Sequence, residues 1–299
     1  MPFTFTTKED RGGAFAEVTG YDGQAAELTL PESLSGLPVK SIAAFAFAER
    51  TDLTSVHLPK SLKSLHLFAF QNCVNLKEVE LFNTTDDYYD GVIRGCRKLS
   101  KITVHLTLPE NFIIAREILN DTDAALSFTF LPEDGEPFSL TFPEYVSEAR
   151  EDTMARAIHF TIEGAGMAYR ECVKKHAIDF REYDTLLPRL TMYDFASAAS
   201  IALGRLQTPV DLTDDARKKY ETFLTDHNKD LLSLLTKQKD TKAVQFLSDR
   251  GLILADAIPE ALEIAAEKKL VEITGILMAV QGKKKETSGG GLSLSLSDW

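Results

Sequence analysis

The sequence predicts an α+β protein in which a short solenoid of stacked coils precedes an all-α region. The first observation is a repeat of twenty-three residues in the N-terminal third. The aligned sets are Leu53, Leu76 and Leu99; Val56, Val79 and Ile102; Leu58, Leu81 and Val104; Phe47, Phe70 and Ile93; and Arg50, Cys73 and Cys96. The second observation is a helical spacing of apolar residues from Pro143 onward. A fixed period of this length is typical of a solenoid, in which each unit buries its apolar face by stacking on its neighbours.

Each repeat unit begins with a short predicted strand. Apolar and polar residues alternate in residues 55–59 and 78–81, which is the period of a half-buried strand. The Ala-Phe pairs at 46–47 and 69–70 are expected to fill the far side of each coil. An irregular earlier unit starts at Leu28, and residues 86–93 of the third unit depart from the Ala-Phe pattern.

Both ends of such a stack need covering, because an open coil exposes unpaired strand edges and apolar side chains. We expect a capping hairpin in the first twenty-three residues, which carry Phe3, Phe5 and a strand-like stretch at 14–18. Clean alternation in 126–130 and 138–142, around a turn at 132–135, predicts a second hairpin. Its apolar stripe should be covered by the helices that follow.

The repeat resembles the BspA-type leucine-rich repeat family. The residues that carry the resemblance are those of 42–47, 65–73 and 76–81, and the opening unit from Leu30 to Val39 is also similar to that family. The resemblance covers roughly residues 13–108. It implies a right-handed leucine-rich-repeat solenoid with a parallel sheet along one face, and a role in binding.

The region from 143 to 285 predicts helices with recognisable ends. Thr213 and Asp240 suit N-caps, Gly251 suits a helix C-cap and Pro259 suits a first helical position. Residues 261–273 resemble an ankyrin helix hairpin, although the ankyrin Thr-Pro-Leu-His turn is missing. A degenerate ankyrin-like array and an ordinary helical bundle both remain open.

These features divide the chain into four predicted parts. Residues 1–110 form the solenoid with its N-terminal cap, 111–142 the capping segment and hairpin, and 143–285 the helical domain. Residues 286–299 form a flexible Gly/Ser hinge and a terminal peptide in which Leu alternates with Ser. That peptide could add a strand to a sheet edge, in its own protein or in a partner.

Composition excludes several classes of protein. With 44% hydrophobic and 26% charged residues, the chain reads as an ordinary globular protein. The net charge of −12 argues against binding nucleic acid or an anionic membrane. Three cysteines without a disulfide pattern, no signal-like start and no membrane-spanning apolar run lead us to expect a cytoplasmic protein.

The residue types that carry chemistry lead us to expect no enzyme, cofactor or metal. No two of the six histidines share a metal-ligand spacing. Residues 164–166 are too short for a dinucleotide loop and suggest a helix break, and Asp86, Asp87 and Asp90 suggest a solvated turn. The repeat positions of Cys73 and Cys96 indicate inert packing. Cys172 beside Lys174, Lys175 and His176 leaves one alternative, a hydrolase in the helical half.

The candidate binding residues are polar positions of the repeat strands and apolar positions of the tail. They are Ser55, His57, Glu78, Glu80, Lys101 and Thr103 in the strands, and Leu292, Leu294, Leu296 and Trp299 in the tail. We therefore expect a non-enzymatic protein-protein interaction module, acting as an adaptor or scaffold in a bacterial cytoplasm, with protein partners. The alternative is a secreted or cell-surface binder of host protein or glycan.

Overall fold

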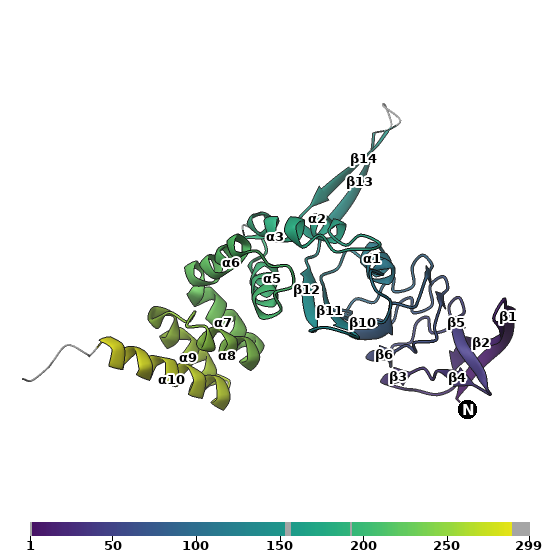
Figure 1. Ribbon diagram of the computed structural model, residues 1–299, viewed down its shortest axis with the longest axis horizontal. Coiled ribbons are helices and arrows are strands. Elements are labelled where there is room, and N and C mark those ends of the chain that lie inside the picture. Colours follow the sequence, from purple (N-terminus) through teal and green to yellow (C-terminus); the bar gives the residue numbers. More distant parts are fainter. Residues whose placement is uncertain (1, 153–156, 192, 289–299) are drawn as a thin grey trace, which may run out of the picture. The chain divides into compact units, whose positions relative to one another are not determined.

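The computed structural model describes residues 2–152, 157–191 and 193–288, and it divides into two compact units (Figure 1). The first unit comprises residues 1–197 and 208–211, and the second comprises 198–207 and 212–299. The boundary therefore lies later than the predicted boundaries at 110 and 142. The first unit includes the capping hairpin and the short helices that cover it.

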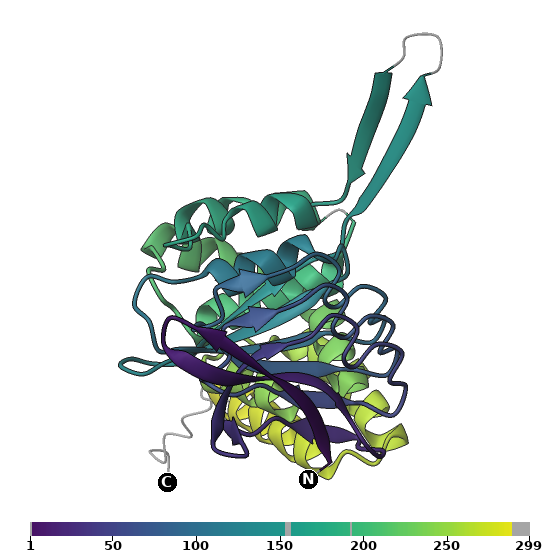
Figure 2. The same cartoon turned by 90° about the vertical axis from the view of Figure 1, so that its right-hand side faces the viewer.

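The first unit is a solenoid in which the chain passes alternately through two sheets (Figure 2). Sheet A contains β2 (Gly13–Tyr21), β5 (Leu37–Ile42), β7 (Ser64–Leu65) and β9 (Asp87–Tyr88), all parallel. Sheet B contains β3 (Glu27–Thr29), β6 (Ser55–His57), β8 (Glu78–Phe82), β10 (Lys101–Leu106) and β11 (Leu126–Pro132), also parallel. The short β4 (Ser33–Leu34) pairs with β5 in antiparallel orientation. The predicted solenoid with parallel strands is confirmed.

The predicted register of the repeats is also confirmed. Val56 pairs with Val79, and Val79 pairs with Ile102. The row continues on both sides, since Leu28 pairs with Val56 and Ile102 pairs with Phe128. All five side chains are buried. Strand β11, predicted as part of a hairpin, thus also belongs to a further coil of the parallel stack.

In the two coils with Ala-Phe pairs, the far side is filled by stacked aromatic rings, as predicted, and Ile93 takes this position in the third coil. The rings of Phe47 and Phe70 are parallel to within 8°, with centroids 5.1 Å apart, and both are buried. Neighbouring rings in offset contact add to the burial of apolar area. The column therefore ties consecutive coils together through their side chains.

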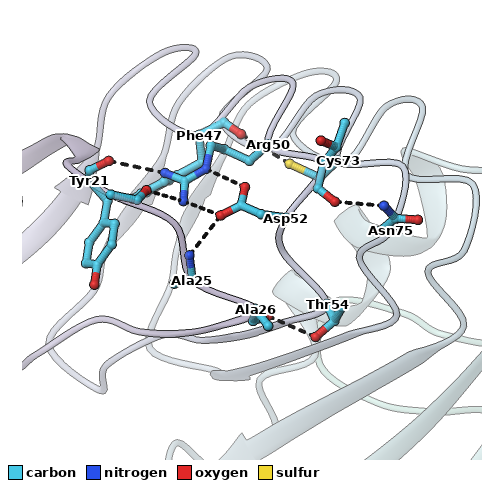
Figure 3. Close-up of polar contacts among 11 residues, drawn as sticks. Tyr21, Ala25, Ala26, Phe47, Arg50, Asp52, Thr54, Cys73 and Asn75 are labelled. Atoms are coloured by element: carbon cyan, nitrogen blue, oxygen red, sulfur yellow. Dashed lines mark hydrogen bonds and ion pairs between the residues drawn. The ribbon is translucent and has the colours of Figure 1, made fainter.

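A second column hydrogen-bonds each coil to the one before it (Figure 3). The thiol of Cys73 donates to the carbonyl oxygen of Phe47 at 3.1 Å, and Cys96 donates to Phe70 in the same way. Arg50 takes this position in the first coil and donates to the carbonyl oxygens of Tyr21 and Gly23, at 3.2 and 2.9 Å. The arginine side chain is longer than that of cysteine, and it makes the equivalent bonds to the end of the N-terminal hairpin, which precedes the first coil.

Arg50 is itself held by Asp52. Its Nε and Nη2 atoms donate to the two carboxylate oxygens at 2.8 and 2.6 Å, and one of these oxygens also accepts from the backbone N–H of Ala25 (Figure 3). The bond from Arg50 and the backbone bond hold the pKa of Asp52 well below its usual value, although burial opposes the shift. The pair thus links the first coil to the chain that enters it.

Sheet A ends at β9, and a carboxylate takes the place of the next strand of this sheet. In the preceding coil, the N–H groups of Phe68 and Phe70 donate to carbonyl oxygens of residues 90 and 92. The equivalent N–H groups of Gly91 and Ile93 donate to the carboxylate of Asp121, at 2.9 and 3.0 Å. Asp121 follows α1 (Ile113–Asn120), the helix that occupies the place of a sheet A strand in this coil. The carboxylate therefore caps the stack.

Hairpins close both ends of the solenoid, as predicted. At the N-terminus, β1 (Phe3–Asp10) pairs antiparallel with β2. At the other end, β12 (Phe138–Phe142) pairs antiparallel with β11. The outer edge of β12 is satisfied by side chains, because the Tyr183 hydroxyl bonds both the N–H and the carbonyl of Thr141, at 3.1 and 2.6 Å. The N–H of Ser139 donates to the Thr208 hydroxyl at 3.2 Å.

Three short helices come later in the chain, and the first two of them pack against this hairpin. They are α2 (Gly166–Glu171), α3 (Phe180–Thr185) and α4 (Leu187–Leu190). The ring of Phe180 meets Phe138 edge-on at 5.8 Å, and the ring of Tyr183 meets Phe142 at 6.1 Å. The prediction that the following helices cover the hairpin is therefore confirmed.

The prediction of helices directly after Pro143 is wrong. Strands β13 (Val146–Asp152) and β14 (Ala157–Glu163) form an antiparallel ribbon there, and it pairs with no other strand of the described chain (Figure 1). The sequence of β14 alternates β-branched or aromatic residues with polar ones, and this period of two outweighs the helical pattern. Gly164–Gly166, expected as a break between helices, joins this ribbon to α2. A side chain at Gly166 would collide with backbone oxygens of residues 143 and 144.

The second unit consists of helices. Their bounds are α5 (Phe195–Gln207, which begins in the first unit), α6 (Asp214–Asp226), α7 (Asn228–Gln238), α8 (Thr241–Asp249), α9 (Ile258–Glu267) and α10 (Val271–Ser288), with a 3-10 turn at Ala255–Ala257. The hydroxyl of Thr213 and the carboxylate of Asp240 accept the predicted N-cap hydrogen bonds. Gly251 follows α8 with φ 69°, and Pro259 lies in the first turn of α9. These four predictions are confirmed.

Two helix pairs of this unit share one turn geometry. Lys239 between α7 and α8 and Lys269 between α9 and α10 both have left-handed φ, 61° and 56°. The next residues donate to equivalent carbonyls, Asp240 to Leu235 and Leu270 to Ala265. Residues 286–288, the first three of the segment 286–299 that was predicted as a hinge and terminal peptide, lie within the bounds of α10. Residues 289–299, with Leu292, Leu294, Leu296 and Trp299, lie outside the described residues.

The Asp121 cap predicts a large loss of stability on truncation. Asp121→Ala leaves two backbone N–H groups and the Tyr88 hydroxyl without their acceptor. We expect the free energy of unfolding to fall by about 2–3 kcal/mol, the usual penalty for buried donors left unpaired. Urea unfolding measures it. Asp134→Ala, in an exposed turn, is the control, and equal stability of the two variants would contradict the capping role.

The Arg50–Asp52 pair predicts a pH dependence of stability. Since the folded-state pKa of Asp52 is lowered, its contribution is full above the ordinary aspartate pKa of about 3.9 and disappears as the pH falls below it. We expect Asp52→Asn to be less stable than the native protein by about 1 kcal/mol at neutral pH. The difference should shrink in unfolding curves at progressively lower pH. A constant difference at all pH values would contradict this assignment.

Candidate protein-binding face

The predicted strand residues come together on the outer face of sheet B, which we call the polar face. Ser55, Glu78 and Lys101 form one row of register partners, and Ser127 of β11 extends it. The parallel row contains His57, Glu80 and Thr103, and Thr129 extends it. Alternate residues of the same strands point into the core, so the two rows are fixed by the packing of the solenoid.

Five of the six predicted strand residues reach the surface. Glu78 and Lys101 are exposed, and His57, Glu80 and Thr103 are half-buried. Ser55 is buried, with 4% of its surface exposed, so the expectation that it offers a contact is not met. Its short side chain lies between Glu27 and Glu78 on the adjacent strands. Its hydroxyl has no hydrogen-bond partner among the described residues.

Glu80 links two histidines at the centre of the polar face. Its carboxylate oxygens lie 2.9 Å from Nδ1 of His57 and 2.6 Å from Nε2 of His105. Burial alone would raise the pKa of Glu80, but the hydrogen bonds with His105 and His57 outweigh it and hold the pKa below the usual value. The cluster therefore keeps a negative charge on the face while fixing both rings.

His105 also lies on the polar face, although it is not among the predicted residues. Its ring stacks on Phe82 of the neighbouring strand, with centroids 4.5 Å apart and planes 19° from parallel. The signal was present, because alternation places His105 on the same face as Thr103, and Phe82 lies twenty-three residues earlier. The polar face thus also contains an aromatic contact.

The environment of Cys172 does not support nucleophilic chemistry. The residue is 1% exposed, and burial raises the pKa of its thiol to about 12. A cysteine nucleophile needs a lowered pKa, because the thiolate is the reacting species. His176 bonds instead to the backbone oxygen of Glu110, at 3.1 Å. Within the described ranges, no group of His, Cys, Asp and Glu residues could hold a metal ion.

Comparison with known proteins identifies the repeat segment. Residues 22–129 match, in six copies, the family model for the BspA type Leucine rich repeat region. This segment is a BspA-type leucine-rich repeat region. The likeness stated from the sequence is thereby confirmed for that part. The match does not extend to the helices of the second unit, so their similarity to ankyrin repeats stays a prediction.

Three solved structures are similar to about a third of this chain. A leucine-rich repeat protein of T. pallidum is 19% identical with a TM-score of 0.24, covering 33% of this chain and 68% of that one. A leucine-rich cell surface protein of Faecalibacterium prausnitzii is 21% identical with a TM-score of 0.29, covering 34% and 31%. A leucine-rich repeat protein of Bacteroides ovatus is 14% identical with a TM-score of 0.22, covering 35% and 48%. This chain thus spans less than half of the second and third structures. No curated protein matches the sequence.

Among the helices that the structure describes, none combines the length and the apolar character needed to cross a membrane.

The burial of the cysteines predicts their reactivity. Cys73, Cys96 and Cys172 are free and buried. We expect none of the three thiols to react with Ellman's reagent at neutral pH in the folded protein, and all three to react after unfolding. Rapid reaction of Cys172 in the folded protein, with Cys172→Ala as the control, would revive the hydrolase alternative.

Proposed function

We propose that this chain is a non-enzymatic protein-interaction module whose leucine-rich repeat region binds a protein partner through the polar face. The observation that carries the proposal is the alignment of charged and polar side chains in two rows across consecutive parallel strands. Strands in a sheet are about 4.8 Å apart, so the rows offer a partner a fixed pattern of charges at a fixed spacing. Repeat solenoids commonly use such surfaces for recognition.

The chemistry of the face favours a polar, salt-sensitive contact. Glu78 and Lys101 are adjacent and opposite in charge, and Glu80 keeps its charge between two histidines. Half-exposed charges contribute more to association rate and partner choice than to affinity. A partner with complementary charges in the same spacing would align on the rows in one register.

We further propose that the module acts as an adaptor or scaffold in a bacterial cytoplasm. Its three cysteines are free, which agrees with a reducing compartment. The second unit adds a helical surface of its own, which suits a chain that connects partners. Fractionation of the source cells separates this proposal from the alternative of a secreted or surface binder, since recovery outside the cytoplasm would contradict it.

Charge reversal on the polar face tests the proposed function. Lys101→Glu changes an exposed residue of the face, whereas Lys98→Glu makes the same charge change in the loop before β10. Partners captured from the source organism with the native chain are purified and titrated against both variants. We expect Lys101→Glu to weaken binding about tenfold or more and Lys98→Glu to leave it unchanged. Equal binding by both variants, with equal melting temperatures, would contradict the role of the polar face.

A further inference from the structure

The side of the solenoid formed by sheet A and the turn after it carries exposed aromatic residues. We call Phe45, His66, Leu67, Phe68 and Tyr89 the aromatic strip. Phe45 is 56% exposed, Tyr89 is 43% exposed and Leu67 is 41% exposed. Large apolar side chains grouped at the surface mark contact sites more often than scattered ones do. The strip is therefore a candidate for a second binding surface.

The strip is ordered by contacts between coils. The rings of Phe45 and Phe68 stack with centroids 5.3 Å apart, and those of His66 and Tyr89 stack at 4.8 Å. The N–H of Phe45 donates to the carbonyl of Leu67 at 3.1 Å, which fixes the two turns relative to each other. A partner would thus meet rings that are already positioned, with little side-chain entropy left to lose.

Backbone strain accompanies the two phenylalanines. Both Phe45 and Phe68 have φ of 59°, a left-handed conformation that is unfavourable for a bulky residue. The next coil has Gly91 at the equivalent position, with φ of 71°. A side chain at Gly91 would collide with the ring of Phe68. Glycine at positions 45 and 68 would relieve this backbone strain, so both phenylalanines are kept for their side chains, and the ring of Phe45 remains 56% exposed although one side of it stacks on Phe68.

The charges around the strip are mainly acidic. Asp86, Asp87 and Glu49 are exposed, and Asp87 shares the outer face of sheet A with Tyr89 because the two residues are two positions apart. Of the nearby bases, Lys63 donates to the carbonyl oxygen of Thr84 at 3.1 Å, and Arg94 lies over the ring of Phe68 and pairs with Asp90 at 3.1 Å. The rim therefore retains negative charge, which complements lysine or arginine in a partner.

We infer that the aromatic strip binds a protein segment in which an apolar or aromatic side chain is flanked by lysine or arginine. The apolar side chain would lie on the open face of Phe45, beside Leu67. The basic groups would meet the carboxylates of Asp86 and Asp87. The inference rests on the proposed function in one respect, that the chain binds proteins, but it concerns a different face.

A short-peptide display experiment tests the inference with the full chain. Random peptides on phage are selected for binding to the native protein, and their affinities are measured by fluorescence anisotropy. We expect enrichment of peptides that combine an apolar anchor with basic residues. Phe45→Gly should weaken their binding about tenfold or more, and Asp87→Lys should weaken it as well. Enrichment of acidic peptides, or equal binding by these variants, would overturn the inference.

Two variants distinguish an effect on folding from an effect on peptide binding. Phe45→Gly places glycine in a conformation that glycine favours, so we expect its melting temperature to stay close to that of the native protein. Lys101→Glu changes the polar face and should leave peptide binding unchanged. If the peptides depend on Lys101 and not on Phe45, the inference fails while the proposed function stands. Sedimentation of the native chain as a dimer that Phe45→Gly abolishes would show the strip to be a self-interface and would also overturn it.

Discussion

The fold of the first unit depends on satisfying the row of backbone donors and acceptors that each coil offers to the next one. Inside the stack this happens automatically, because consecutive coils have the same register. At the ends it requires special residues. The carboxylate of Asp121 accepts from the N–H groups of Gly91 and Ile93, and the Tyr183 hydroxyl serves both backbone groups of Thr141. Unpaired edges would otherwise invite pairing with other chains.

The same constraint explains why the first coil carries an arginine where the later coils carry cysteines. A thiol reaches the carbonyl of the coil directly below it, as Cys73 does with Phe47. The segment below the first coil is the N-terminal hairpin, and Arg50 reaches Tyr21 and Gly23 of the chain leaving that hairpin. The substitution keeps the contact and adds the pair with Asp52. A departure from the repeat consensus is thus an adaptation to an end of the stack.

Interactions that repeat in every coil were predictable from the sequence, and interactions that occur once were not. The buried row through Val56, Val79 and Ile102 was predictable, because stacking imposes one period on every coil. The capping role of Asp121 was not, since it occurs once and joins residues about thirty positions apart. The ribbon of β13 and β14 was not predicted, because its period of two extends over only seven residues in each strand and precedes a much longer helical pattern.

Of the two candidate surfaces, the polar face was predictable from the sequence and the aromatic strip was not. The two rows of the polar face were predictable from strand alternation, but the burial of Ser55 depends on the lengths of its neighbours, Glu27 and Glu78. The aromatic strip could not be predicted in this way. An apolar residue such as Phe45 is expected in the core, but with its left-handed φ it is exposed.

The two faces also differ in what they can contribute to binding. Charges such as those of the half-buried Glu80 and the exposed Lys101 are screened by salt, and they act mainly on the rate of encounter and on register. When a partner covers exposed rings, apolar surface is removed from water. The free energy gained mainly slows dissociation of the complex. A partner that contacts the polar face alone would therefore bind weakly and with strong salt dependence. A segment on the aromatic strip would bind with less dependence on salt, because Phe45 and Leu67 carry no charge. Titrations in low and high salt can consequently assign a captured partner to one face before any variant is made.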